Sequence, residues 1–250
     1  MSLDGKVSIV TGGAGGLGLE IAKELARNGS VVVITSRKKS KLEIASNMVG
    51  KKCYGFELDV SKSKSIAQFF KRISKDFDTI DILVNNAGFP FERDIWFKKV
   101  HDITDKELLN ILQVDLIGSF RISKEILKIM MKKSKGVIIN IASTPAISGH
   151  SCGSPYSIAK AGLIGLTKHI ALEYGRYNIR SYSVALGDID TQAMRKSLSK
   201  SELQKARNEN TLKRLGRPEE IAKSIASIAG ENFTFSTGNT LIIDGGKLVI

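Results

Sequence analysis

The chain has 250 residues, of which 42% are hydrophobic and 25% are charged. These values are typical of a globular protein with a large core, and they exclude a disordered or fibrous chain. The formal net charge of +13 would attract polyanions, but the lysines are scattered over predicted helices without interleaved aromatic residues, as on solvated helix faces. We therefore expect no nucleic-acid partner.

Short apolar, β-branched runs alternate with helix-length amphipathic segments along the whole chain, which indicates a parallel sheet. The runs predict seven strands, at residues 7–11, 31–35, 53–58, 80–84, 137–141, 179–184 and 240–243. Right-handed crossovers would cover both faces of the sheet with helices. We expect one α/β domain over residues 1–250, a doubly wound Rossmann sheet whose ligand crevice lies at the carboxyl ends of the strands.

The chain enters its first strand without the basic and apolar regions of a signal peptide, and no apolar run is long enough to span a membrane. These features predict a cytoplasmic protein with no membrane partner. Cys53 and Cys152 form no Cys-x-x-Cys motif, so we expect reduced, unpaired thiols. The three histidines lack metal-ligand spacing, so we expect no metal site.

The first strand ends in a turn with five glycines within residues 11–18. Such a turn lets backbone N–H groups and a helix amino end approach a pyrophosphate. The turn fits two patterns, Gly-x-Gly-x-x-Gly through Gly13, Gly15 and Gly18, or Thr-Gly-x3-Gly-x-Gly through Thr11, Gly12, Gly16 and Gly18. The residues alone do not choose between them, and Leu17 is part of the same candidate dinucleotide site.

The second strand ends at Arg37, which two lysines follow. Folds that select NAD usually place a carboxylate here to bind the adenosine ribose. A guanidinium instead suits a 2′-phosphate, which it can bind through two hydrogen bonds. This position predicts NADP(H) in preference to NAD(H).

Two long predicted helices, at residues 105–131 and 156–174, carry apolar residues around most of their circumference. A single stripe facing the sheet would need fewer of them. A second buried surface is therefore implied. A subunit interface in a symmetric homo-oligomer is the preferred interpretation, and burial under another helix of the same chain is the alternative.

Ser143 follows the fifth strand, and Tyr156 and Lys160 begin the second long helix. At a spacing of four residues, Tyr156 and Lys160 share one face of a helix. An ammonium near a phenol favours the phenolate, which makes the phenol a better proton donor. Ser143, at a strand end, could hold the substrate oxygen that receives the proton. The motif predicts a hydride-transfer enzyme.

With these motifs the chain resembles the short-chain dehydrogenase/reductase family over nearly its full length, and within that family the 3-oxoacyl-acyl-carrier-protein reductases. The resemblance implies that Ser143, Tyr156 and Lys160 are catalytic, with Tyr156 as the general acid. It also implies further cofactor contacts at Asp59, Val60, Asn86, Ala87, Gly88, Gly187, Ile189 and Thr191. Asn85 is expected to brace the sheet.

Two positions depart from the family pattern. Asp115 stands where the family has an asparagine that interrupts a helix and anchors a proton-relay water. A carboxylate near Lys160 would favour the charged ammonium, so we expect a working relay with a different pH dependence. Leu186 replaces a proline before Gly187, and the loss of a fixed φ is expected to loosen the loop that follows.

The resemblance implies an NADP(H)-dependent oxidoreductase that reduces a 3-oxoacyl thioester and assembles as a homotetramer. A sugar or polyol dehydrogenase of the same family is the alternative, and a dinucleotide-binding regulator without turnover is the rival from another class. Residues 89–102, with Phe91, Trp96 and Phe97, either line the substrate mouth or pack against a neighbour. The sequence does not separate these two roles.

Overall fold

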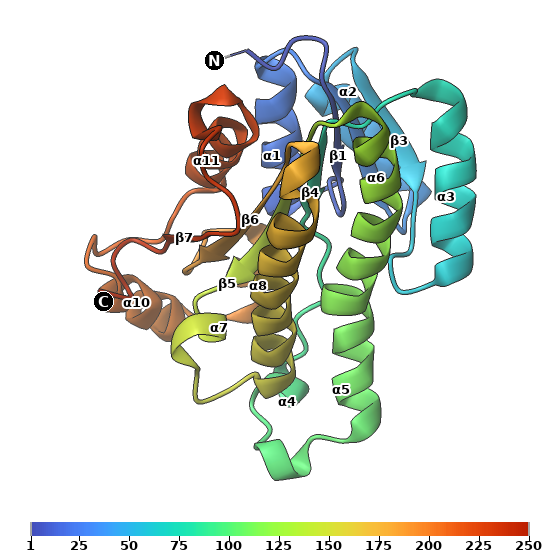
Figure 1. Cartoon of the computed structure of the whole chain (residues 1–250). Coiled ribbons are helices and arrows are strands. Elements are labelled where there is room, and N and C mark those ends of the chain that lie inside the picture. The colour runs from blue at the N-terminus through green and yellow to red at the C-terminus, as the bar shows by residue number, and fades with distance from the viewer. Residues whose placement is uncertain (1, 250) are drawn as a thin grey trace.

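The computed structural model describes residues 2–249. Seven parallel strands form one sheet in the order β3-β2-β1-β4-β5-β6-β7, so the winding reverses between β1 and β4 (Figure 1). The strands are β1 (Val7–Val10), β2 (Val31–Ser36), β3 (Cys53–Glu57), β4 (Ile82–Asn85), β5 (Gly136–Ser143), β6 (Ile179–Leu186) and β7 (Thr240–Ile243). The predicted doubly wound sheet is confirmed, and no strand end differs from its expected position by more than two residues.

Alternation along the strands sends neighbouring side chains to opposite faces of the sheet. On one face, Val10 packs among apolar side chains of α1 (Gly16–Arg27), α2 (Lys39–Val49) and α11 (Pro218–Ala229). On the other, Ile9 packs with α3 (Ser63–Asp76), α6 (Ser119–Lys133) and α8 (Ser154–Tyr174). Figure 1 shows α6 and α8 side by side in front of the sheet. Two cores therefore hold the strand ends in fixed positions.

The segment predicted as one helix over residues 105–131 is interrupted. It consists of α5 (Asp105–Leu112), the π-helical segment η2 (Gln113–Gly118) and α6. A π segment widens the helix by one residue per turn, and such segments are frequent at functional sites. Periodicity alone did not reveal the interruption, because apolar residues continue through it.

Shorter elements complete the described chain. They are α4 (Arg93–Trp96), η1 (Val100–Asp102), α7 (Pro145–Ser148), η3 (Gly175–Tyr177), α9 (Gln192–Ser197), α10 (Lys200–Glu209) and η4 (Glu231–Phe233). None of the helices within residues 2–249 combines the length and the apolar character that a membrane crossing requires. Cys53 and Cys152 are both free thiols, as expected.

Candidate active site

Helix α8 places Tyr156 and Lys160 one turn apart near its amino end. The Lys160 Nζ lies 5.4 Å from the centroid of the Tyr156 ring. Lys160 is buried, whereas Tyr156 is only partly buried. The predicted contact between ammonium and phenol ring is therefore present, with the ammonium on the protein side and the phenol open toward solvent.

Asp115 forms an ion pair with Lys160, with Oδ2 3.2 Å from Nζ. Both side chains are almost completely buried, with 1% and 5% exposure for the two residues. Burial of Lys160 acts to lower its pKa, but the negative charges of Asp115 and of an ionised Tyr156 outweigh this effect and raise the pKa above its ordinary value. The carboxylate therefore keeps Lys160 charged, as the sequence predicted.

The other carboxylate oxygen of Asp115 binds a different segment. Its Oδ1 accepts a hydrogen bond from the backbone N–H of Phe89 at 2.5 Å. A side chain at Gly88 would also reach the carboxylate, with its Cβ 3.6 Å from Oδ2. Asp115, presented by the π segment η2, thus joins the loop after β4 to Lys160 on α8. This direct link is the part that sequence reasoning missed, since it expected a water-anchoring role.

Ser143 is the last residue of β5 and pairs in register with Leu186 of β6. Its Oγ donates a hydrogen bond to the carbonyl oxygen of Leu186 at 3.2 Å. Because the Ser143 side chain is only partly buried, its lone pairs and its rotatable hydroxyl remain available at the carboxyl edge of the sheet. The hydroxyl is positioned by the strand pairing, as a group that holds a substrate oxygen would need to be.

The glycine-rich turn after β1 is braced by the loop after β4. The Thr11 Oγ1 accepts hydrogen bonds from the backbone N–H groups of Asn86 and Ala87, both at 3.0 Å. In return, Asn86 Nδ2 donates to the carbonyl oxygen of Thr11 at 2.9 Å. A Cβ at Gly18 would come within 2.5 Å of the same Asn86 nitrogen, so only glycine allows this approach. These contacts fix the shape of the turn.

The turn leaves the amino end of α1 free for an anion. Gly15, the N-cap, has no side chain to cap the helix, and the first turn of α1 carries no acidic residue. Gly16 is exposed and has a φ of +52°. Uncapped N–H groups and the positive end of the helix dipole favour a phosphate here. The residues present fit the pyrophosphate of a dinucleotide.

Arg37 follows β2, is exposed and takes part in none of the ion pairs found within residues 2–249. Asp59 follows β3, and its Oδ1 accepts hydrogen bonds from the backbone N–H and the hydroxyl of Ser61. Burial acts to raise the pKa of Asp59, but these hydrogen bonds and the nearby Lys62 lower it. The guanidinium is thus free for a 2′-phosphate, while the carboxylate is held at the adjacent strand end.

Asn85 and Val60 act in the framework of the site. The buried Asn85 Nδ2 donates to Ser123 Oγ at 2.9 Å and to Asn140 Oδ1 at 2.8 Å, which confirms its expected role in bracing the sheet. Val60 is buried, and a Cβ at Gly118 would lie 2.9 Å from its side chain. The segment after β3 is therefore packed directly against the π segment, and the end of β4 is bonded to α6 and β5.

The loop after β6 is tied down despite the missing proline. A Cβ at Gly187 would lie 2.7 Å from the Cα of Asp244, so the backbone packs against the end of β7. Asp188 forms an ion pair with Lys247 at 2.7 Å, and Ile189 forms an isolated parallel bridge with Gly216. Thr191 caps α9 through its Oγ1. These contacts oppose the loosening that the sequence led us to expect.

An aromatic cluster centred on Trp96 lies beside Tyr156. The Trp96 ring lies 5.6 Å from that of Tyr156, 5.6 Å from that of Phe91 and 5.8 Å from that of His150. Sequence reasoning left residues 89–102 undecided between the substrate mouth and a packing surface. The structure places Trp96 of this segment at the candidate active site, a contact that no motif spacing indicates.

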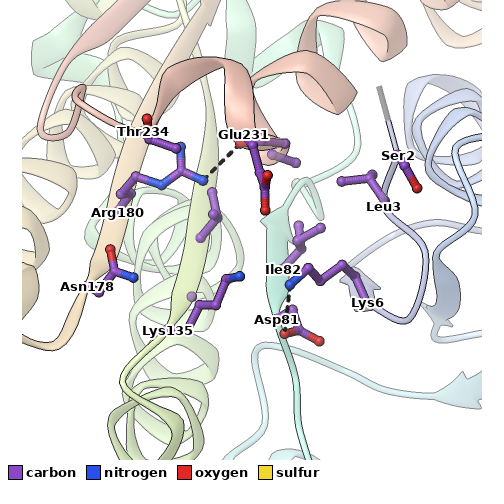
Figure 2. Close-up of a pocket in the computed structure, with 14 residues that line it drawn as sticks. Ser2, Leu3, Lys6, Asp81, Ile82, Lys135, Asn178, Arg180, Glu231 and Thr234 are labelled. Carbon is purple, nitrogen blue, oxygen red and sulfur yellow. Dashed lines mark hydrogen bonds and ion pairs between the residues drawn. The ribbon is translucent and has the colours of Figure 1, made fainter.

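A separate cavity of about 140 Å³ lies at the opposite, amino end of the sheet (Figure 2). Lys6 and Lys135 meet there, and the side-chain contact with Lys135 lowers the pKa of Lys6. Asp81 lies 3.9 Å from the Lys6 ammonium, Glu231 also lines the cavity, and Arg180 donates to two backbone carbonyls beyond α11. Three cationic side chains thus face two carboxylates in this cavity, and none of its lining residues belongs to the constellation around Tyr156.

No metal-binding group of three or more His, Cys, Asp or Glu side chains occurs within the described part of the chain.

Comparisons with known proteins place the chain among proteins that are described as reductases and dehydrogenases. Residues 12–247 match the family model described as enoyl-(acyl carrier protein) reductase. The chain is 36% identical to the 3-oxoacyl-(acyl-carrier-protein) reductase of Vibrio cholerae serotype O1, over 250 residues and 100% of both chains.

Two solved structures extend the comparison. A protein described as a short chain dehydrogenase/reductase family protein is 30% identical, with a TM-score of 0.89 and 98% coverage of both chains. A putative gluconate dehydrogenase from Agrobacterium tumefaciens is 26% identical, with a TM-score of 0.94, covering 100% of this chain and 98% of the other. Sequence and fold therefore point to the same group of oxidoreductases.

Proposed function

The chain belongs to the short-chain dehydrogenase/reductase family of oxidoreductases, and from this premise we propose that it uses NADP(H) to reduce the ketone of a 3-oxoacyl thioester. One observation carries the proposal: the partly exposed phenol of Tyr156 lies over a buried ammonium that a buried carboxylate keeps charged. A structural tyrosine needs no such arrangement, whereas a proton donor does.

The cofactor half of the proposal rests on the glycine turn and on Arg37. The uncapped amino end of α1 would hold the pyrophosphate, and Arg37 would bind the 2′-phosphate. Asp59, Val60 and residues 86–88 would contact the adenosine side, and Gly187, Ile189 and Thr191 the nicotinamide side. When bound, NADPH supplies the hydride that reduces the carbonyl carbon.

The protein's own residues would deliver the proton. Ser143 Oγ holds the carbonyl oxygen of the substrate, and the Tyr156 hydroxyl donates its proton to that oxygen as negative charge develops. Lys160 stabilises the phenolate that remains, and Asp115 stabilises Lys160. In the oxidative direction Tyr156 accepts the proton instead.

The choice of a 3-oxoacyl thioester is supported by the relative from Vibrio cholerae, whose name specifies that substrate and whose whole length is matched. The structural likeness to a putative gluconate dehydrogenase favours a second candidate, a sugar or polyol dehydrogenase. The substrate pockets of this family are built from loops, so the shared fold does not choose between the two.

We also propose a symmetric homo-oligomer, a tetramer. Large apolar side chains are exposed on the helix layer formed by α5, α6 and α8. Leu109 and Phe120 are each 52% exposed, Ile158 is 52% exposed and Leu172 is 83% exposed. Apolar side chains gathered on neighbouring helices favour association with a second copy. Light scattering in solution measures the assembly directly.

The decisive experiment follows NADPH absorbance with acetoacetyl thioesters and NADP⁺ absorbance with a panel of sugars and polyols. Oxidation of NADPH by the thioester is the expected result. Turnover of the sugar panel alone would select the dehydrogenase alternative. Tight binding of NADPH without turnover of any substrate would instead support a dinucleotide-binding regulator and overturn the proposed enzyme.

A further inference from the structure

Trp96 is the central ring of the aromatic cluster beside Tyr156. Its neighbours come from two separate segments. Phe91 precedes α4, whereas His150 lies in the loop between α7 and α8 and Tyr156 lies in α8. Ring centroids 4.5–7 Å apart are in the range where aromatic pairs attract one another. With Phe91 and His150 packed against it, the indole has little room to move away from Tyr156.

The backbone around Trp96 is also fixed. Its carbonyl oxygen accepts a hydrogen bond from the N–H of Gly153 at 2.7 Å. Gly153 has a φ of +70°, and a Cβ there would lie 2.5 Å from the indole, so the loop before α8 fits closely against the ring. At the other end of α4, Arg93 forms an ion pair with Glu202 of α10 at 2.9 Å. These contacts hold the Trp96 backbone in place and pack the indole against the loop before α8.

The burial of the neighbours of Tyr156 defines how a substrate reaches it. Lys160 is buried inside the protein, whereas Trp96 and Tyr156 are both partly exposed. A ketone approaching from solvent must bring its oxygen to about 2.6–3.2 Å from the phenol oxygen for proton transfer. The substrate carbon next to the ketone then lies close to the groups that touch the Tyr156 ring. Trp96 is the largest of these groups.

We propose that Trp96 is a specificity-determining residue, which admits a ketone flanked by an unbranched carbon chain and excludes one that is branched at the carbon next to the ketone. The inference rests on the proposed function, because it takes Tyr156 as the proton donor. A hydrophobic pocket discriminates by about 10–200-fold for each methylene group that a substrate gains or lacks. Two methyl groups beside the ketone would meet the indole directly.

The test compares two thioesters of N-acetylcysteamine, 3-oxohexanoyl and 4-methyl-3-oxopentanoyl, which have the same number of carbons and differ only in branching next to the ketone. The value of kcat/KM is measured for both with the wild type, Trp96→Leu, Trp96→Phe and the control Phe97→Leu. Phe97 is the next residue, 47% exposed and in contact with Arg93 rather than with Tyr156. Circular dichroism and NADPH binding check the fold of each variant.

We expect the wild type to favour the unbranched ketone. Trp96→Leu should raise the ratio of branched to unbranched kcat/KM by about 10-fold or more. Trp96→Phe should move the ratio in the same direction by a smaller factor, and Phe97→Leu should leave it unchanged. Since a purely structural role would lower both rates together, the ratio separates specificity from stability.

An unchanged ratio in both Trp96 variants would overturn the inference, as would a wild type that reduces the two ketones equally well. If Trp96→Leu does not fold, Trp96→Phe, which keeps an aromatic ring, still decides the question through its ratio. Failure of the proposed function gives a different result, because the wild type then reduces neither ketone.

Discussion

Replacement of Asp115 by Asn tests the charge pair on which the candidate site depends. Asp115→Asn removes one negative charge and keeps an oxygen for the Phe89 N–H. The Lys160 ammonium, which is buried, is then left without a countercharge. We expect the variant to be less stable than the wild type. As the pH is raised, its activity should also fall at a lower pH than that of the wild type, because Lys160 loses its proton more easily without the carboxylate.

The magnitude follows from the distance. Two unit charges 3.2 Å apart interact by roughly 5 kcal/mol at an effective dielectric constant of about 20. Removal of one member of a buried pair is observed to cost about 3–5 kcal/mol, since the remaining charge stays desolvated. Because the introduced amide would still bind the Phe89 N–H, we expect the lower end of this range, about 3 kcal/mol in the free energy of unfolding.

The pH dependence has a defined sign. The pKa of Lys160 in the folded chain lies above its ordinary value of 10.5. The stabilisation from the pair is therefore complete at pH values below 10.5 and is lost only as the pH rises through the higher folded pKa. In the variant, burial without the countercharge lowers the Lys160 pKa. The difference in unfolding free energy between wild type and variant should therefore be constant below that lowered pKa and narrow as the pH rises above it.

Urea unfolding between pH 7 and pH 11 measures the stability difference, and the pH profile of kcat/KM measures the effect on catalysis. Asp76→Asn is a matched control, since Asp76 is exposed at the end of α3 and undergoes the same chemical change. Equal stabilities within about 1 kcal/mol, together with coincident pH profiles, would refute the reasoning, because a change below that size is typical of a surface substitution.

Three further substitutions test other parts of the site. Tyr156→Phe should lower kcat by about 10²–10⁴-fold, the usual contribution of a general acid, while NADPH binding measured by fluorescence persists; a variant with normal kcat would exclude Tyr156 as the proton donor. Arg37→Ala should weaken NADPH binding by about 10–100-fold through loss of a charge-assisted hydrogen bond and leave NADH binding unchanged, so equal effects on both cofactors would contradict a 2′-phosphate contact. Phe120→Lys, which places a charge on a side chain that is 52% exposed, should reduce the assembly measured by light scattering without affecting NADPH binding, and an unaltered assembly would show that this helix face is not an interface.

Local sequence patterns determined the sheet and the cofactor turn. β-Branched runs predicted all seven strands because the residues of a buried parallel strand lie next to one another in the chain. The glycine turn could be predicted because its requirement is also local. The close approach of the backbone after β1 leaves room only for glycine at position 18. The spacing of Tyr156 and Lys160 predicted their contact, because both lie on one helix.

Other features depended on segments that are distant in the sequence. The sequence suggested that Asp115 would affect Lys160, but the double contact with Lys160 and Phe89 depends on a π segment that apolar periodicity does not reveal. The retained order of the loop after β6 depends on Lys247, which lies 59 positions beyond its partner Asp188.

The position of Trp96 was decided by tertiary structure alone. Its segment has neither the period of a strand nor that of a long helix, and its partners Gly153 and Tyr156 belong to a different loop and helix. The sequence by itself determined which elements form and which residues stand at their ends, because backbone geometry and apolar periodicity act between neighbours. Which loops cover those ends was settled only by packing, since it depends on the shapes that meet once the sheet has formed.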